Sequence, residues 1–456
     1  MKTAAKRLIF VAWSAAIGCG LVTAGARAQK PDKGIETFDA VWRLVNETYF
    51  DPAFNGVDWQ KAREEYRPSA ERASTLEELR SVIREMLGRV GGSHLQLLAA
   101  DVVDGPRPAV QSNDPGSPAV SRDGDLGIDV RALNGQLLVT RVEPGQSAAN
   151  AGVKPGWILS MMDGTAFEGR AASDPRRSDS SMTARALRRF VGAVGSTATF
   201  ACLDLDDRPV ILELERTPRR GQRVKLDNLP EEYVVVTYGW LPSRGRSRIG
   251  VTGFNTWAAP VVEQFGSAVR ALHQADGLIV DLRGNSGGVA HLIPQIASHF
   301  FADPVVLGKW IHRGGEIPIR TTASPIGTAA AEGGAFRGPV AILIDGLSHS
   351  STELFAAAMQ SLGRARVFGE VSYGGALGAM ISRLPNGDVL EHAVVQFVTA
   401  AGETPGARGI RPDQLVALSR QSLIAGEDPV IRAAQQWIEG AGGSPRASAL
   451  LPAVQR

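Results

Sequence analysis

A buried strand, a short loop and a helix follow one another at residues 339–362, and this succession constrains the fold more than any other part of the chain. Residues 340–344 (VAILI) form a continuous apolar run, which is typical of a strand buried on both faces of a sheet. After the loop, residues 353–360 (ELFAAAMQ) are strong helix formers. The pattern predicts an α/β layer in which helices cover parallel strands.

Ser350 lies in the turn of this unit. A serine at the beginning of a helix has backbone N–H groups and the positive end of the helix dipole beside it. These groups stabilise the oxyanion that forms in acyl transfer. A serine hydroxyl is a weak nucleophile, so this chemistry also requires a base elsewhere in the chain. The alternative interpretation is that Ser350 only caps the helix.

The same alternation extends over residues 230–418. Residues 249–254 (IGVTGF) and 277–282 (GLIVDL) have the composition of strands, and residues 260–274 and 292–301 that of helices. The second strand runs into residues 281–288 (DLRGNSGG), where two adjacent glycines can present N–H groups to a reacting carbonyl. A phosphate-binding loop is disfavoured, because the segment lacks both the GKS/GKT ending and the GxGxxG spacing.

The N-terminus has the features of a secretion signal. Lys2, Lys6 and Arg7 precede the apolar residues 8–23, and residues 26–28 (ARA) fit an A-x-A cleavage site. We therefore expect an exported protein, periplasmic or extracellular. Lipoprotein processing at Cys19 is a second interpretation, ranked lower because Ala16 stands where a leucine is usual.

Composition excludes some partners and bonds. The net charge is only +2, which gives no reason to expect nucleic acid or an anionic membrane as partner. If Cys19 is removed with the signal, Cys202 is the only cysteine left, so an intramolecular disulfide cannot form. The apolar surroundings of Cys202 in TATFACLDL predict a buried, inert thiol.

Residues 147–164 (SAANAGVKPGWILSMMDG) resemble a PDZ domain of the bacterial protease type. The resemblance implies that Leu126, Gly127 and Ile128 form the loop that binds a peptide carboxylate, while the peptide adds to a sheet edge. The alternative for Gly127 is that it only serves a tight turn.

Four segments together resemble the peptidase family of the C-terminal processing proteases and the tricorn protease core. They are residues 91–95 (GGSHL), 281–288, 348–370 (SHSSTELFAAAMQSLGRARVFGE) and 408–413 (RGIRPD). The resemblance implies a multidomain α/β fold with an N-terminal helical region, a PDZ domain and a crotonase-like, ClpP-like peptidase core. It also implies that Ser350 is the nucleophile and that the N–H groups of Gly288 and Ser351 form the oxyanion hole.

The two branches of this family use different residues as the general base. The processing proteases use a lysine 25 residues after the serine, and here that position is Gly375. The tricorn-like branch takes a histidine from a Ser-His pair, which Ser93-His94 matches. We therefore predict His94 as the general base, since an imidazole accepts a proton near neutral pH. Its orienting partner is left open between Glu403 and Ser93 itself.

The predicted organisation divides the chain as follows: signal peptide 1–28, N-terminal helical domain 34–97, linker 98–123, PDZ domain 124–218, serine peptidase core 230–418, C-terminal helix 427–440 and disordered tail 441–456. We expect an endopeptidase that acts on polypeptides, with a regulatory adaptor or a C-terminal peptide bound at the PDZ domain, and with no metal, nucleotide or other cofactor. Two alternatives remain: a catalytically inactive peptidase-fold protein that binds peptide C-termini, and an esterase.

Overall fold

The computed structural model describes residues 33–100, 123–168, 175–225, 231–242, 247–322 and 334–442. The predicted signal peptide, most of the predicted linker and nearly all of the predicted tail lie outside these residues. None of the described helices is long and apolar enough to cross a membrane.

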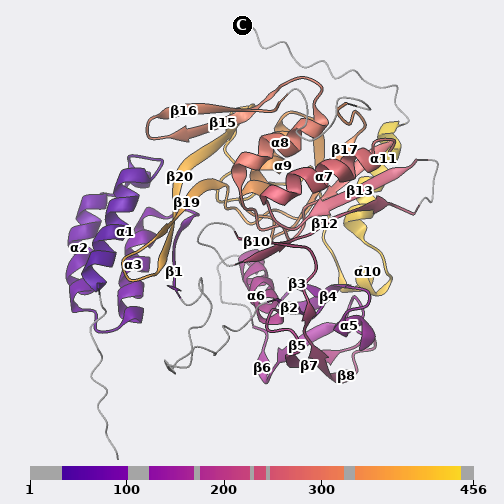
Figure 1. Cartoon of the computed structure of the whole chain (residues 1–456), viewed down its shortest axis with the longest axis horizontal. Coiled ribbons are helices and arrows are strands. Elements are labelled where there is room, and N and C mark those ends of the chain that lie inside the picture. Colours follow the sequence, from indigo (N-terminus) through magenta and orange to yellow (C-terminus); the bar gives the residue numbers. More distant parts are fainter. Residues whose placement is uncertain are drawn as a thin grey trace, which may run out of the picture.

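The N-terminal region is a small helical bundle, indigo in Figure 1. It consists of α1 (Gly34–Thr48), the short η1 (Phe54–Gly56), α2 (Trp59–Arg72) and α3 (Leu76–Val90). Apolar residues at helical spacing, such as Phe38 and Val41 of α1 and Ile83 of α3, are completely buried. The bundle core continues into Leu390 and Ala393, so the helices pack against the sheet described next.

An antiparallel sheet links the bundle to the rest of the molecule. Its strands are β1 (Leu95–Leu98), β15 (Val306–His312), β16 (Gly315–Arg320), β19 (Leu377–Arg383) and β20 (Val389–Thr399). They follow the order β1-β20-β15-β16, and β19 also pairs with β20. The register places Gln96 opposite Glu391, so a segment just after α3 lies beside one almost 300 residues later.

A second unit occupies residues 123–218 and lies below the core in Figure 1. Its elements are β2 (Gly124–Asp125), β3 (Ile128–Leu133), β4 (Gln136–Val142), α5 (Ser147–Asn150), β5 (Ile158–Met162), β6 (Thr165–Ala166), α6 (Pro175–Phe190), β7 (Thr197–Leu203), β8 (Pro209–Glu215) and β9 (Thr217–Pro218). The main sheet has the order β3-β4-β5-β7-β8, which leaves β3 at an edge covered by α6. Cys202 is free and buried within this unit, as predicted, and burial raises the pKa of its thiol to about 12.

The core is a six-stranded sheet of order β12-β13-β14-β17-β18-β21. The strands are β12 (Val236–Trp240), β13 (Ile249–Phe254), β14 (Gly277–Asp281), β17 (Val340–Ile344), β18 (Ala365–Gly369) and β21 (Gln414–Leu415), preceded by the hairpin β10 (Gln222–Val224) and β11 (Glu232–Val234). All pairs from β13 to β21 are parallel. The three strands predicted from the apolar runs are thereby confirmed as β13, β14 and β17.

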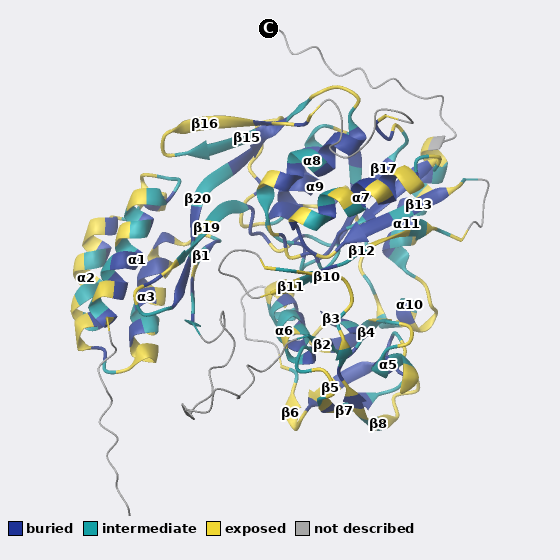
Figure 2. Cartoon of the chain, viewed as in Figure 1, coloured by how far each residue is buried: buried dark blue, intermediate teal, exposed yellow. Residues whose placement is uncertain are grey.

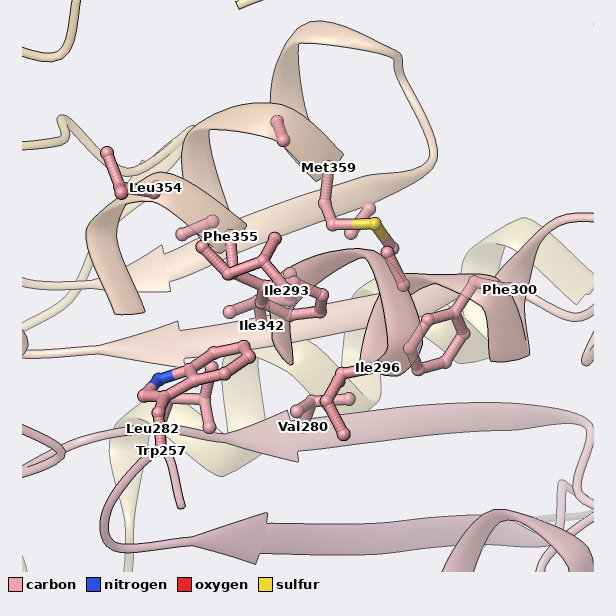
Figure 3. Close-up of a cluster of buried hydrophobic side chains, with 14 of the residues drawn as sticks. Trp257, Val280, Leu282, Ile293, Ile296, Phe300, Ile342, Leu354, Phe355 and Met359 are labelled. Carbon is pink, nitrogen blue, oxygen red and sulfur yellow. The ribbon is translucent and has the colours of Figure 1, made fainter. Parts of the chain in front are cut away.

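Helices cover both faces of this sheet, which explains why every residue of the central strand β17 is buried (Figure 2). One face packs against α7 (Ala259–Ala271), α8 (Ile293–Ala297) and α9 (Ser351–Ser361), and Figure 3 shows Val280 and Ile342 pointing toward Phe355 and Ile296. The opposite face, with Ile279 as a member, packs against α11 (Pro429–Gly442).

Two further details differ from or extend the predictions. The helix predicted at 292–301 is three short pieces, η2 (Ala290–Leu292), α8 and η3 (Ser298–Phe300). Ser298 Oγ donates to the carbonyl of Pro294, a local bond that competes with regular helix. The helix predicted at 427–440 is confirmed as α11, and the short α10 (Arg420–Ile424) before it contacts the second unit through Leu423.

Candidate active site

Ser350 lies at the N-cap of α9, directly after the loop that leaves β17. Its backbone has φ 52° and ψ −121°, a conformation that non-glycine residues rarely adopt. Such strain costs on the order of 1–3 kcal/mol and is concentrated at functional sites. The Ser350 N–H donates to Glu353 Oε2 at 2.9 Å, which holds the turn in this shape.

Glu353 is the hub of the loops around the serine. Its side chain is fully buried and accepts hydrogen bonds from the N–H groups of Gly374 and Gly375, at 2.7 and 2.8 Å, and from Ser372 Oγ. Burial raises the pKa of this carboxyl, and the hydrogen bonds oppose that rise. Glu353 Oε2 accepts hydrogen bonds from both the Ser350 N–H and the Gly375 N–H. Residue 375, where the resemblance would place a lysine, therefore lies close to the serine.

The glycine-rich turn after β14 packs directly against the serine. A Cβ at Gly287 would lie 2.7 Å from Ser350 Cβ and 3.1 Å from Ser351 N, and its φ of +93° also requires glycine. Ser351 Oγ donates to the carbonyl of Gly288 at 2.8 Å. Within the described residues, the N–H groups of Gly288 and Ser351 donate to no other protein group. The two predicted oxyanion-hole residues are thus side by side, with N–H groups available.

His94 is buried, with only 4% of its surface exposed, in the segment between α3 and β1. Its Nδ1 lies 3.2 Å from Ser93 Oγ, and its Nε2 lies 3.7 Å from Glu391 Oε1. Burial, with a smaller contribution from the charge of His349, lowers the pKa of His94 to about 3. The imidazole is therefore neutral at physiological pH and able to accept a proton, while burial makes its charged form costly.

Glu391, on β20, is the carboxylate that the structure brings to His94. Burial raises its pKa to about 7, and a hydrogen bond from Gln96 opposes the rise. The sequence leaves two orienting partners open, and of these Ser93 has its Oγ 3.2 Å from His94 Nδ1. Glu403 is exposed in the turn after β20, where its N–H donates to Thr399 Oγ1, and it makes no ion pair with His94 within the described residues.

His349 is the residue that sequence reasoning missed. Its ring stacks on that of His94, with centroids 5.0 Å apart and planes inclined by 13°, and its other neighbour is the edge of Tyr373. The ring lies over Gly375, where an added Cβ would be 1.8 Å from Nε2. Burial lowers the pKa of His349 to about 4, and a hydrogen bond to the carbonyl of Ser286 opposes this. The sequence pattern that could have identified His349 is a histidine directly before Ser350, combined with a glycine at position 375.

Within the described residues, Ser350 Oγ makes no hydrogen bond of 3.5 Å or less with His94 or His349. Hydrogen bonds of catalytic groups are often long without substrate and shorten in the complex. Nor does the described part of the chain contain a group of three or more metal-ligating side chains.

In the loop predicted to bind a peptide carboxylate, the groups that would face the ligand are buried or bonded within the loop. Leu126 and Ile128 are buried, and the Gly127 N–H donates to Asp125 Oδ1 at 2.6 Å. On the edge strand β3, the Ala132 N–H donates to Thr183 Oγ1 of α6 at 2.8 Å, so one of its backbone donors is used within the unit.

The second unit contacts the serine loop. Arg131 Nε of β3 donates to Asp345 Oδ2 at 2.7 Å, and Ser180 Oγ of α6 donates to the carbonyl of Gly346 at 2.9 Å. A cleft of about 1840 Å³ lies beside these contacts and is lined by Asp179, Leu347 and residues 401–411, among others.

Comparison with known proteins agrees with this picture. Residues 248–416 match peptidase family S41, and residues 35–88 match the tricorn protease C1 domain. Tricorn protease homolog 1 of Streptomyces coelicolor is 26% identical over 86% of this chain, and the carboxyl-terminal-processing protease of Synechocystis sp. is 24% identical over 91% of this chain and 88% of its own length. The chain spans about a third of the length of the two Streptomyces coelicolor tricorn homologues that it matches.

Solved structures show the same fold. The photosystem II D1 C-terminal processing protease superposes with a TM-score of 0.53, at 19% identity, over 86% of this chain and 97% of its own. Mature CPAF superposes with a TM-score of 0.54, at 11% identity, over 90% of this chain and 96% of its own. Residues 248–416 and 35–88 are therefore similar to an S41 peptidase domain and a tricorn C1 domain, in a mixed α/β fold shared with these solved proteases, which agrees with the resemblance seen in the sequence.

Proposed function

We propose that this chain, which carries a peptidase family S41 domain, is an exported serine endopeptidase that cleaves polypeptides with Ser350 as nucleophile and His94 as general base. The observation that carries the proposal is the contact between the strained Ser350 turn and the Gly287-Gly288 turn, with two unused N–H groups beside the hydroxyl. The cap of a helix does not require a strained backbone, whereas strain and free N–H donors both serve an acyl-transfer site.

The proposed reaction has two stages, acylation of Ser350 and hydrolysis of the acyl-enzyme. Ser350 Oγ forms a bond to the carbonyl carbon of the substrate, its proton passes to His94, and the carbonyl π electrons move to the oxygen, where the N–H groups of Gly288 and Ser351 hold the oxyanion. The C–N bond then breaks, and the imidazolium gives its proton to the leaving amine. Water cleaves the acyl-enzyme by the same sequence. In this scheme Glu391 takes the role first considered for Glu403, because its carboxylate stabilises the imidazolium at 3.7 Å.

We further propose that residues 124–218 are a PDZ domain that recruits or gates the substrate. The edge strand β3 and the adjacent α6 have the arrangement at which a peptide can add to a sheet. The contacts of Arg131 and Ser180 with the loop before Ser350 supply a path from peptide binding to the nucleophile. The signal-like N-terminus supports export of the chain to the periplasm or the exterior.

A single comparison tests the catalytic assignment. The mature chain, Ser350→Ala and His94→Ala are incubated with an unfolded protein and, separately, with a fluorophosphonate probe that labels activated serines. The wild type is expected to cleave and to be labelled, Ser350→Ala to do neither, and His94→Ala to be slowed by at least about 100-fold. Wild-type cleavage by His94→Ala would assign the base to another residue.

The alternative of a catalytically inactive peptide-binding protein is less well supported. Gly375 removes only the lysine version of the site. The serine turn, the paired glycines and a buried imidazole are all present, and the named relatives are proteases.

A further inference from the structure

We propose that His349 is a positioning residue for His94: glycine at 375 makes room for the His349 ring, and this ring fixes the plane of the His94 imidazole. The inference rests on the proposed function of Ser350 and His94. It adds His349 to the residues that the sequence analysis assigned to this reaction.

The first argument is steric. A Cβ at position 375 would lie 1.8 Å from His349 Nε2 and 2.4 Å from Cδ2, so no residue other than glycine fits beneath the ring. Gly375 has no positive φ, which means that its backbone conformation does not itself demand glycine. The close approach of the ring is thus the reason for glycine here, and the two positions are coupled.

The second argument is the geometry of the ring pair. His349 lies flat on His94, at 5.0 Å between centroids, and is itself held from the other side by the edge of Tyr373 at 4.6 Å. The backbone N–H of His349 donates to the carbonyl of Asn285 at 3.1 Å, which ties the residue to the glycine-rich turn. His94 cannot rotate out of its plane without displacing a ring that is fixed by two other elements.

The third argument is charge. Among the described residues, three titratable groups surround the pair of His94 and His349: Tyr373 in the segment after β18, Glu353 of α9 beneath Gly375, and Glu391 of β20 beside His94. Burial lowers the pKa of both imidazoles, that of His349 to about 4 and that of His94 to about 3, so both rings are neutral near neutral pH, and a proton on one would disfavour a proton on the other. The pair therefore enters the reaction with His94 unprotonated.

Four variants test this inference: His349→Ala, His349→Phe, Gly375→Ala and the double variant His349→Ala/Gly375→Ala. The matched control is His299→Phe, because His299 is also buried and its pKa is also lowered to about 4, but its ring contacts Phe265 in the core. Fluorophosphonate labelling rates and kcat/KM on an unfolded protein are measured from pH 4 to pH 8, and thermal unfolding checks that each variant folds.

We expect His349→Ala and Gly375→Ala each to lower the labelling rate by roughly tenfold or more, and the double variant to be no slower than either single one, because both changes remove the same ring contact. His349→Phe keeps a flat ring against His94 and is expected to retain the wild-type labelling rate at pH 7 within about threefold.

The outcomes separate the two proposals. If the wild type is active and His349→Ala has the rate and pH profile of the His299→Phe control, the inference is wrong and the proposed function stands. The inference is equally overturned if the losses of the two single variants multiply in the double variant. If the wild type is neither labelled nor active, the proposed function fails and the role of His349 falls with it.

Discussion

The Ser350 N–H and the Gly375 N–H donate to the same oxygen of Glu353, at 2.9 and 2.8 Å. A single buried carboxylate therefore fixes both the strained Ser350 turn and the loop that holds Gly375. Since four hydrogen bonds converge on Glu353, its removal affects every part of the site at once.

Glu353→Gln is expected to lower both stability and activity. The amide keeps one acceptor oxygen but turns an NH₂ group toward backbone N–H donors, which leaves buried donors unpaired. We expect a loss of about 2–4 kcal/mol in the free energy of unfolding and at least a tenfold slower fluorophosphonate labelling of Ser350. Urea unfolding and labelling kinetics measure the two effects. Glu263→Gln, an exposed change on α7, is the control, and equal behaviour of the two variants would contradict the role of Glu353.

Glu391→Gln is expected to slow the reaction by roughly 10- to 100-fold, because the neutral amide cannot stabilise the imidazolium. In the wild type, kcat/KM should rise with pH through about 7 as Glu391 ionises, and this rise should be absent from the variant. Steady-state kinetics between pH 5 and pH 9 check this. An unchanged pH profile would remove Glu391 from the mechanism. Glu403→Gln is the matched control and should be nearly silent.

The same carboxyl has an opposite effect on stability. The folded-state pKa of Glu391 is about 7, above its ordinary value of 4.5, so the native state holds a proton that the unfolded chain has lost between these pH values. Stability contributed by this group is present at low pH and is lost as the pH rises to 7. We therefore expect Glu391→Gln to gain on the wild type by up to about 3 kcal/mol between pH 4.5 and 7. A difference in the free energy of unfolding between Glu391→Gln and the wild type that does not change with pH would contradict this.

Arg131→Met is expected to uncouple the second unit from the serine loop. Asp345 is buried, which opposes its ionisation, yet Arg131 and several N–H donors lower its pKa. Removing the guanidinium leaves this charge without its partner, at a cost of about 3–5 kcal/mol in the free energy of unfolding. Arg141→Met, on the neighbouring strand with a side chain 64% exposed, should cost less than about 1 kcal/mol. Thermal unfolding of both variants and the labelling rate of Ser350 test the difference.

Thr183→Val is expected to strengthen peptide binding at β3. The Thr183 hydroxyl accepts from the Ala132 N–H, a donor that an added peptide strand would use. Valine has the same shape but no acceptor, so the N–H is left for the ligand, and we expect about 3- to 10-fold tighter binding. Fluorescence anisotropy with labelled hexapeptides that have a free C-terminal carboxylate measures the affinity. Ser181→Ala on the same helix serves as control, and unchanged affinity in Thr183→Val would place the peptide site elsewhere.

Local rules were sufficient for much of the architecture. Apolar runs at residues 249–254, 277–282 and 340–344 predicted the strands β13, β14 and β17, because a strand buried on both faces leaves a continuous hydrophobic signature. The positions of Ser350 and of the glycine pair before Val289 followed from the same strand–turn–helix pattern. The signature of the C-terminal helix also gave α11 within a few residues at each end.

The sequence by itself thus determined the nucleophile turn, the glycine turn and the absence of a lysine at 375, since each depends on neighbours within a few residues. Only the tertiary structure shows which side chains lie around residue 375 and around His94. The pairing of β1 with β20 brings Glu391 to His94, and strand register over almost 300 residues cannot be read from local patterns. The direction of the His349 side chain likewise depends on the space above Gly375, which exists only when α9, the loop after β18 and the segment before β1 are packed together.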